Sequence, residues 1–189
     1  MNELVFLLEE RSMQEVLQVV VPPLVPEHVT CRFIPHEGKH DLEKSIPRKL
    51  RAWQVPGAQF VVVRDKDAGD CKKVKKKLAQ LCTNGHRPDT LVRIVCHHLE
   101  AWFLGDLAAV EKAYELNGVA KRQGERKFCD PDRLVNAEDE LRRLVSEYQK
   151  IGGSRIIAPH LTIDANKSHS FNVFLDGVRR LVETEKKSP

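Results

Sequence analysis

Four short apolar runs, each followed by a helix-like pattern, constrain the fold of this chain more than any other feature of its sequence. The runs lie at residues 4–8 (LVFLL), 29–34 (VTCRFI), 59–63 (QFVVV) and 91–95 (LVRIV). They are nearly continuous rather than alternating, which is typical of strands covered on both faces. Repeated strand-then-helix units of this kind predict an α/β fold, in which helices cover both faces of a parallel sheet of about four strands.

Helix start and stop signals divide the segments between these runs. One helix is expected after Asp41, and Pro47 within its pattern must mark the start of the helix, a bend or a break. A lysine-rich helix is expected after Asp70, which can cap it. Residues 99–116 predict a further helix with a bend at Gly105.

The 189 residues are enough for one ordinary domain with a small extension. Residues 118–131 have no apolar period, which predicts a mobile loop or a boundary. We therefore expect an α/β core in residues 1–117 and a helical C-terminal extension in residues 118–189 that packs on the core.

Beyond this boundary the apolar pattern predicts two further helices. The first spans residues 136–151 and is expected to end at Gly152 and Gly153. Residues 155–161 predict a short extended segment, and residues 171–182 predict a last amphipathic helix.

Composition excludes several classes of protein. A membrane span needs about 20 consecutive apolar residues, whereas the most apolar stretch, residues 16–25, contains Gln18 and two prolines. The first ten residues include three acids instead of the basic region of a secretory signal, so we expect a cytoplasmic protein. The five cysteines are scattered without a Cys-x-x-Cys pair, which predicts reduced thiols rather than disulfides or structural zinc.

Charge is segregated along the chain. Residues 1–31 carry one basic and five acidic side chains, a balance of −4, and residues 32–87 carry fourteen basic and six acidic, a balance of +8. Residues 88–189 carry sixteen of each and balance to zero. A basic block of this kind favours a polyanionic partner, most often nucleic acid, although it can also be a solvated face.

Acidic residues follow the first and third predicted strands. Glu9 and Glu10 come after the first, and Asp65, Asp67 and Asp70 come after the third. In an open parallel sheet, ligands bind at the carboxyl ends of the strands, where the strand order reverses. A strand order of 2-1-3-4 would bring both sets of acids to one crevice.

This acidic cluster predicts a metal site. An Asp-x-Asp turn can direct two carboxylates at one hard cation, and Glu9 from the neighbouring strand could complete an oxygen-ligand set for Mg²⁺ or Mn²⁺. The alternative is that Asp65 and Asp67 are turn residues and Asp70 a helix cap. Because clustered carboxylates repel one another unless a cation neutralises them, the sequence favours metal ligands at Glu9, Asp65, Asp67 and Asp70.

The two acidic segments, LVFLLEERSMQEVL and FVVVRDKDAGD, resemble the Toprim domain. That Rossmann-like domain is shared by topoisomerases, bacterial primases and overcoming-lysogenization-defect nucleases, and the resemblance covers residues 3–105. It implies that Glu9 takes the place of the family glutamate, and Asp65 and Asp67 that of the aspartate pair. Glu10 stands where the family usually has glycine.

A narrower resemblance extends into the second half of the chain. LLEERSM, HEGKHDLEKSIPRKLRAW, HHLEAWFLGD and SRIIAPHLTIDANKSHSF are similar to a bacterial group of Toprim-like proteins often encoded beside an ATPase in genome-defence neighbourhoods. This resemblance implies a Mg²⁺-dependent nuclease acting on DNA or RNA, possibly restrained by an ATPase partner in anti-phage defence. Glu9 would act as a general acid or base, or as a further ligand.

Further polar residues are expected to support this chemistry. Lys39 follows the second strand and could neutralise a phosphate oxygen at the same edge, unless it is only an exposed loop lysine. Glu100 follows the fourth strand and is predicted to be an accessory catalytic residue. We expect a set of basic residues to contact phosphates, although the basic helices could instead be a solvated face. The set is Arg48, Lys49, Arg51, Lys72, Lys73, Lys76, Arg155 and Lys167.

Two other classes of function compete with a nuclease. One is a non-catalytic regulatory or adaptor subunit that binds an ATPase or nucleic acid, although such a protein has no need for acids at two strand ends. The other is a phosphoryl-transfer or receiver-type α/β domain, but haloacid-dehalogenase-type enzymes carry their Asp-x-Asp after the first strand. The sequence does not distinguish DNA from RNA as the substrate, or one bound metal ion from two, and it does not determine the oligomeric state.

Overall fold

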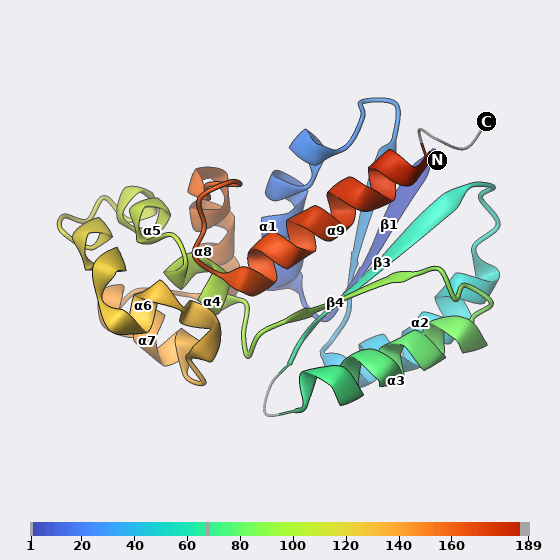
Figure 1. Cartoon of the computed structure of the whole chain (residues 1–189), viewed down its shortest axis with the longest axis horizontal. Helices are drawn as coiled ribbons and strands as arrows, with labels where there is room; N and C mark the ends of the chain where they lie inside the picture. The colour runs from blue at the N-terminus through green and yellow to red at the C-terminus, as the bar shows by residue number, and fades with distance from the viewer. Residues whose placement is uncertain (1, 67–68, 186–189) are drawn as a thin grey trace.

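A computed structural model describes residues 2–66 and 69–185 of the chain, with side chains described up to Glu183. Four strands form one parallel sheet in the order β2-β1-β3-β4 (Figure 1). The predicted α/β fold is confirmed, and each predicted strand agrees with the structure to within two residues at either end. The strands are β1 (Glu3–Leu8), β2 (Thr30–Pro35), β3 (Ala58–Asp65) and β4 (Leu91–Val95).

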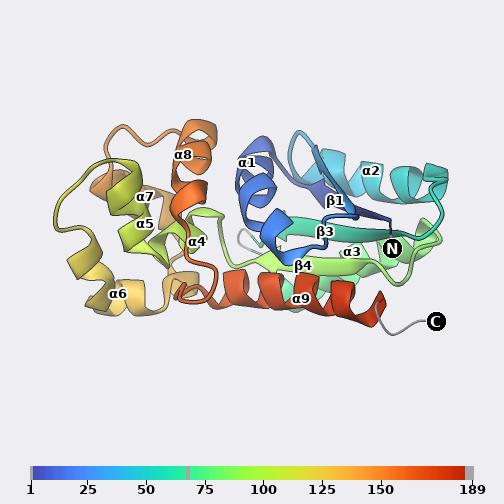
Figure 2. The same ribbon diagram turned by 90° about the horizontal axis from the view of Figure 1, so that it is seen from above.

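Helices cover both faces of the sheet, as Figures 1 and 2 show. The two faces receive alternate residues of each strand, so Phe6 and Leu8 point into one apolar cluster whereas Val5 and Leu7 point into the other. The first cluster lies under α1 (Arg11–Val20) and α9 (His169–Glu185), and the second lies under α2 (Lys39–Ala52) and α3 (Cys71–Asn84).

The remaining helices gather to one side of the sheet, beyond the carboxyl end of β4 (Figures 1 and 2). Short 3-10 turns connect several of them, and α8 packs against α1. These helices are α4 (Glu100–Leu104), α5 (Leu107–Ala113), α6 (Arg126–Cys129), α7 (Ala137–Leu144) and α8 (Lys150–Ile157).

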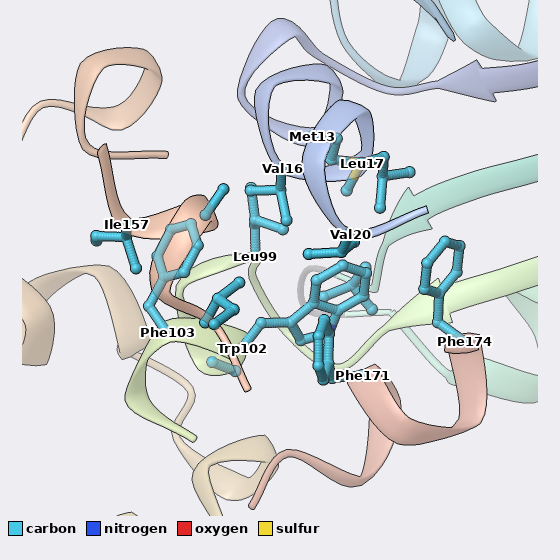
Figure 3. Packing of buried hydrophobic residues seen from close by; sticks show 14 of the residues in the cluster. Met13, Val16, Leu17, Val20, Leu99, Trp102, Phe103, Ile157, Phe171 and Phe174 are labelled. Atoms are coloured by element: carbon cyan, nitrogen blue, oxygen red, sulfur yellow. The ribbon is translucent and has the colours of Figure 1, made fainter. Parts of the chain in front are cut away.

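One apolar cluster joins this helical group to the sheet (Figure 3). The Trp102 ring on α4 lies between two rings of α9, with centroids 5.1 Å from Phe171 and 5.4 Å from Phe174. The Phe174 ring in turn packs against Phe6 of β1, with 6.5 Å between the two ring centroids. Core residues that precede and follow position 117 in the sequence therefore share the same buried cluster.

The predicted helix over residues 136–151 is wrong. The chain forms α7, turns, and forms α8, and Gly152 and Gly153 lie inside α8 instead of ending a helix. A Cβ atom on Gly153 would lie 2.3 Å from Cε2 of Tyr148, so this glycine permits a close packing contact. Residues 155–161 are expected to be extended, but residues 155–160 belong to α8 and to a 3-10 turn at Ala158–His160.

The expected loop over residues 118–131 is also wrong, because it contains a 3-10 turn at Ala120–Gly124 and the helix α6. Phe128 is fully buried there. The side-chain amide of Gln123 donates to the carbonyl oxygens of Leu104 and Phe128, at 3.1 and 2.8 Å. Tertiary contacts therefore order a segment whose sequence has no apolar period.

Two helix boundaries differ from expectation. Residues 99–116 divide into α4 and α5 because the Asp106 carboxylate accepts a hydrogen bond from the Ala109 N–H at 3.1 Å and caps a new helix. The helix α2 begins at Lys39, and Pro47 lies inside it. Its buried residues Leu42, Ile46 and Leu50 pack on the sheet and hold this helix in place.

None of the helices in residues 2–66 and 69–185 combines the length and the apolar character needed to cross a bilayer.

Candidate functional site

Glu9 and Asp65 meet at the carboxyl edge of the sheet. Leu8 of β1 is paired with Val63 of β3, so the strand ends place Glu9 beside the last residues of β3. The backbone N–H of Asp65 donates a hydrogen bond to Oε2 of Glu9 at 3.0 Å. The Arg64 guanidinium lies 3.8 Å from the same oxygen. The strand order therefore brings together one acid from each predicted segment.

The Asp65 carboxyl group is buried, with only 4% of the residue exposed. Its Oδ1 has no hydrogen-bond partner among the described residues, and its Oδ2 lies 3.9 Å from Nδ1 of His98. Burial raises the pKa of Asp65 well above its ordinary value, and the nearby carboxylates of Glu9, Glu10 and Glu100 raise it further. An ionised Asp65 therefore requires a compensating cation.

Glu100 is the first residue of α4 and is fully buried. The turn before it contains His97 with a φ of 60°, a left-handed conformation that is uncommon for a residue with a side chain. The Tyr148 hydroxyl donates to Oε1 of Glu100 at 2.9 Å, whereas Oε2 has no partner in the described part of the chain. Burial raises the pKa of Glu100.

Lys150, the first residue of α8, brings a positive charge to this edge. Its Nζ lies 2.8 and 3.0 Å from the two carboxylate oxygens of Glu10. Burial alone would lower the pKa of Lys150, but the bond to Glu10 and the charges of Glu100 and Asp65 outweigh burial and raise it. Lys150 therefore stays protonated and offsets part of the acidic charge.

Sequence reasoning missed the contributions of Tyr148 and Lys150. Both fall at the end of the segment that was expected to be one long helix, and their arrival at the site depends on how α8 packs against α1. The one local signal is the pair of glycines after them, since Gly153 lies against the Tyr148 ring.

Two other predicted ligands, Asp67 and Asp70, follow β3 in the sequence. Asp67 falls outside the described residues. Asp70 is exposed, and its Oδ1 accepts a hydrogen bond from the Lys73 backbone N–H at 2.8 Å. This bond lowers the pKa of Asp70. In the structure Asp70 is therefore the N-cap of α3, the alternative that its sequence context left open.

Lys39 opens α2 directly after Gly38, whose φ is 89°, and its side chain is half-buried. Farther along α2, Glu43 accepts hydrogen bonds from Arg64 and Lys77, each at 2.7 Å. Arg64 therefore links the end of β3 to α2 as well as to the acidic edge.

The predicted phosphate contacts fall into groups with different surroundings. Arg51 donates to the carbonyl oxygen of Asn84 at 2.8 Å and joins α2 to the end of α3. Arg155 forms two hydrogen bonds to Glu15, at 2.7 and 3.0 Å, and joins α8 to α1. Lys49 is half-buried on α2, and the exposed residues of the set are Arg48, Lys72, Lys73, Lys76 and Lys167.

The donor set fits a hard divalent cation in its chemistry, because two buried carboxylate oxygens, on Asp65 and Glu100, lack partners among the described residues. Within residues 2–66 and 69–185, no group of three or more His, Cys, Asp or Glu side chains is arranged so that it could hold a metal ion. Mg²⁺ commonly needs only one or two carboxylates and keeps several waters. Glu9 and Asp65 are two carboxylate residues that meet at this edge of the sheet.

Comparison with known proteins gave one match. The model of a family described as "Domain of unknown function (DUF4276)" matches residues 8–179. A search of curated proteins found no match, and a search of solved structures found none either. The matched range includes Glu9, Asp65, Glu100 and Lys150.

Proposed function

For this chain, which belongs to the DUF4276 family, we propose the function of a metal-dependent phosphodiesterase of Toprim type that acts on DNA or RNA. One observation carries the proposal. A buried Asp65 carboxyl group, with an oxygen that lacks a partner among the described residues, is held beside Glu9 at the edge between β1 and β3. Such an arrangement is unfavourable for ionised carboxylates unless a cation is bound.

Glu9 and Asp65 would hold Mg²⁺ or Mn²⁺, together with water and substrate oxygens. When bound, the ion supplies Lewis-acid stabilisation of the phosphate and activation of a water molecule. The raised pKa of Asp65 implies that this side chain gives up a proton on ionising, so metal affinity should fall in acid.

The chain's own residues then orient and move protons. The Asp65 N–H helps to fix the position of the Glu9 carboxylate, which would accept a proton from water or return one to the leaving oxygen. The Lys150 ammonium, which pairs with Glu10 at this edge, would stabilise the negative charge that develops in the reaction. Exposed lysines at the start of α3 favour contact with the phosphate backbone beside the same edge.

The Toprim resemblance supports two finer proposals. The first is that the chain is the effector subunit of an ATPase-gated anti-phage defence system. The second is that Glu9 and Asp65 act together with Asp67, so that the aspartate pair and the glutamate form one metal site.

The direct test is a cleavage assay on the full chain with Mg²⁺ or Mn²⁺ and a panel of plasmid, linear DNA and total RNA. We expect cleavage with metal, none with chelator, and a loss of at least about a hundredfold in Glu9→Gln and Asp65→Asn. Asp89→Asn, at an exposed acid, is the matched control and should retain activity. Equal cleavage by all four proteins would reject the proposed site.

A non-catalytic adaptor subunit is the second candidate, and one observation favours it. Lys150 already pairs with Glu10 and interacts with Asp65 and Glu100, so a protein cation neutralises part of the acidic edge. An adaptor of this kind would bind an ATPase or nucleic acid with the same affinity in the presence and absence of divalent metal.

A further inference from the structure

A cavity of about 370 Å³ opens beside the acidic edge. Its walls are residues 10–12, at the start of α1, residues 36–38, before α2, and residues 150–151, at the start of α8. Three segments far apart in the sequence therefore meet around it. A cavity of this volume is within the range used by small-molecule ligands.

Three helix N-termini open at this cavity. The N-cap residues of α1, α2 and α8 are Glu10, Gly38 and Gln149. In these three described helices, the N-cap residue forms no hydrogen bond from its side chain to the first-turn N–H groups. By contrast, Asp70 caps α3 and Asp106 caps α5. Uncapped N–H groups and the helix dipole make each such terminus equivalent to roughly half a positive charge.

His36 provides an independent indication of a ligand. The residue lines the cavity and is only 6% exposed. Its Nδ1 lies 2.8 Å from the carbonyl oxygen of Leu8, which can only accept, so Nδ1 carries the hydrogen. Its Nε2 is buried without a partner in the described part of the chain. Such an atom costs free energy unless a ligand contacts it.

The charges around the cavity point to an anion. Among its walls, Arg11 and Lys150 are balanced by Glu10 and Glu37. The side chains of the walls therefore contribute no net charge. The three helix N-termini add roughly 1.5 positive charges, which outweigh the single negative charge of Asp41 in the first turn of α2. Helix N-termini of this kind bind phosphate through their backbone N–H groups.

We propose that this cavity binds a phosphate monoester group, the group found at a phosphorylated nucleic-acid end or on a free mononucleotide. The uncapped N–H groups donate to the phosphate oxygens, and one proton is shared between a phosphate oxygen and Nε2 of His36. A phosphodiester has no proton of its own to offer, so it binds less well. Burial lowers the pKa of His36, which makes a protonated ring costly in the empty cavity.

Phosphate binding can be measured without cleavage, in chelator, so failure of the proposed nuclease activity would not affect the result. The probes are inorganic phosphate, 5′-AMP, and one oligonucleotide with either a 5′-phosphate or a 5′-hydroxyl group, each titrated into the full chain by calorimetry. We expect phosphate and 5′-AMP to bind. Tighter binding of the 5′-phosphorylated oligonucleotide would identify a strand end as the source, and equal binding of the two oligonucleotides would identify the free monoester.

Two variants test the cavity itself. The variant His36→Asn keeps an amide donor for the Leu8 carbonyl but removes Nε2. It should weaken phosphate binding by at least about tenfold, because one hydrogen bond to a charged group is lost. Arg11→Gln changes an exposed residue and should also weaken binding, even if His36→Asn does not fold. Lys44→Gln, on the exposed side of α2, is the control. Absence of phosphate binding to the parent chain, or unchanged affinity in both cavity variants, would overturn the proposal.

Discussion

Asp65 shows at the scale of one residue how a functional group can reduce stability. Its carboxyl group is buried near three other carboxylates, and its pKa is raised in the folded chain. The folded state therefore binds more protons than the unfolded state once the pH exceeds the ordinary aspartate value of about 3.9. Stability contributed by this group is lost as the pH rises from that value through the folded-state pKa.

Asp65→Asn should therefore stabilise the metal-free protein, by about 0.5 to 2 kcal/mol near pH 8 and by less near pH 5. Urea unfolding at the two pH values measures the difference in the free energy of unfolding. Asp89→Asn, an exposed change, should alter it little at either pH. A destabilisation by Asp65→Asn that is equal at both pH values would show that Asp65 is a structural hydrogen-bonding residue instead.

Gly152 and Gly153 form a matched pair on α8. A Cβ atom on Gly153 would lie 2.3 Å from the Tyr148 ring, whereas a Cβ on Gly152 would only touch Cβ of Gln149 at 3.8 Å. Gly153→Ala should destabilise the protein by about 1 to 3 kcal/mol through overpacking. Gly152→Ala should stabilise it by roughly 0.5 to 1 kcal/mol through helix propensity. Thermal unfolding of both variants checks the pair, and shifts of the same sign would contradict this packing.

At the scale of elements, α3 presents lysines whose surroundings differ. Lys77 is exposed and pairs with Glu43 at 2.7 Å, and Lys72, Lys73 and Lys76 are exposed as well. Replacing these three by Gln should weaken nucleic-acid binding and reduce the slope of log K against log salt by about 2.7, at about 0.9 for each phosphate contact.

Fluorescence anisotropy over a range of salt concentrations measures that slope. The control replaces Lys112 and Lys121, exposed residues of the helical group, by Gln. An unchanged slope in the α3 variant would identify these lysines as a solvated face.

The same scale explains which elements sequence reasoning predicts. The strand at residues 91–95 is predicted at its observed bounds because a strand of a parallel sheet has a local signature, a nearly continuous apolar run. The segment containing Gly152 and Gly153 was misread because a helix-ending glycine and a closely packed glycine look alike in sequence. Segment 118–131 is ordered by distant contacts of Phe128, which no local pattern reveals.

The candidate site also contains both residues that can be predicted from the sequence and residues that cannot. Glu9 and Asp65 could be brought together from sequence because Glu9 directly follows β1, Asp65 ends β3, and these two strands are neighbours in the sheet. Tyr148 and Lys150 could not, since they reach the site through packing of α8 on α1.

At the scale of the whole molecule, the sheet and the helical group meet at the acidic edge. Lys150 joins α8 to Glu10 at the end of β1, and the cluster around Trp102 joins α4 to α9. A partner that displaced α8 would therefore change the charge balance around Asp65. This arrangement offers a physical route by which a second protein could regulate the site.

From the proposal that an ATPase gates the site, we expect the isolated chain to cleave slowly and the ATPase, with ATP, to increase the rate. Gating requires that the partner bind one state of the site better than another, because equal affinity shifts no population. Cleavage is compared for the chain alone, with the ATPase and ATP, and with the ATPase and ADP. Full cleavage by the chain alone, unchanged by the ATPase, would indicate a free-standing nuclease.

Calorimetric titration of Mn²⁺ into the full chain tests the central claim most directly, because it depends on neither a substrate nor a partner. We expect saturable binding to the parent chain and to Asp89→Asn, with affinity reduced at least about tenfold in Glu9→Gln and in Asp65→Asn. Absence of binding to the parent chain, or equal affinity in all four proteins, would contradict a metal site formed by Glu9 and Asp65.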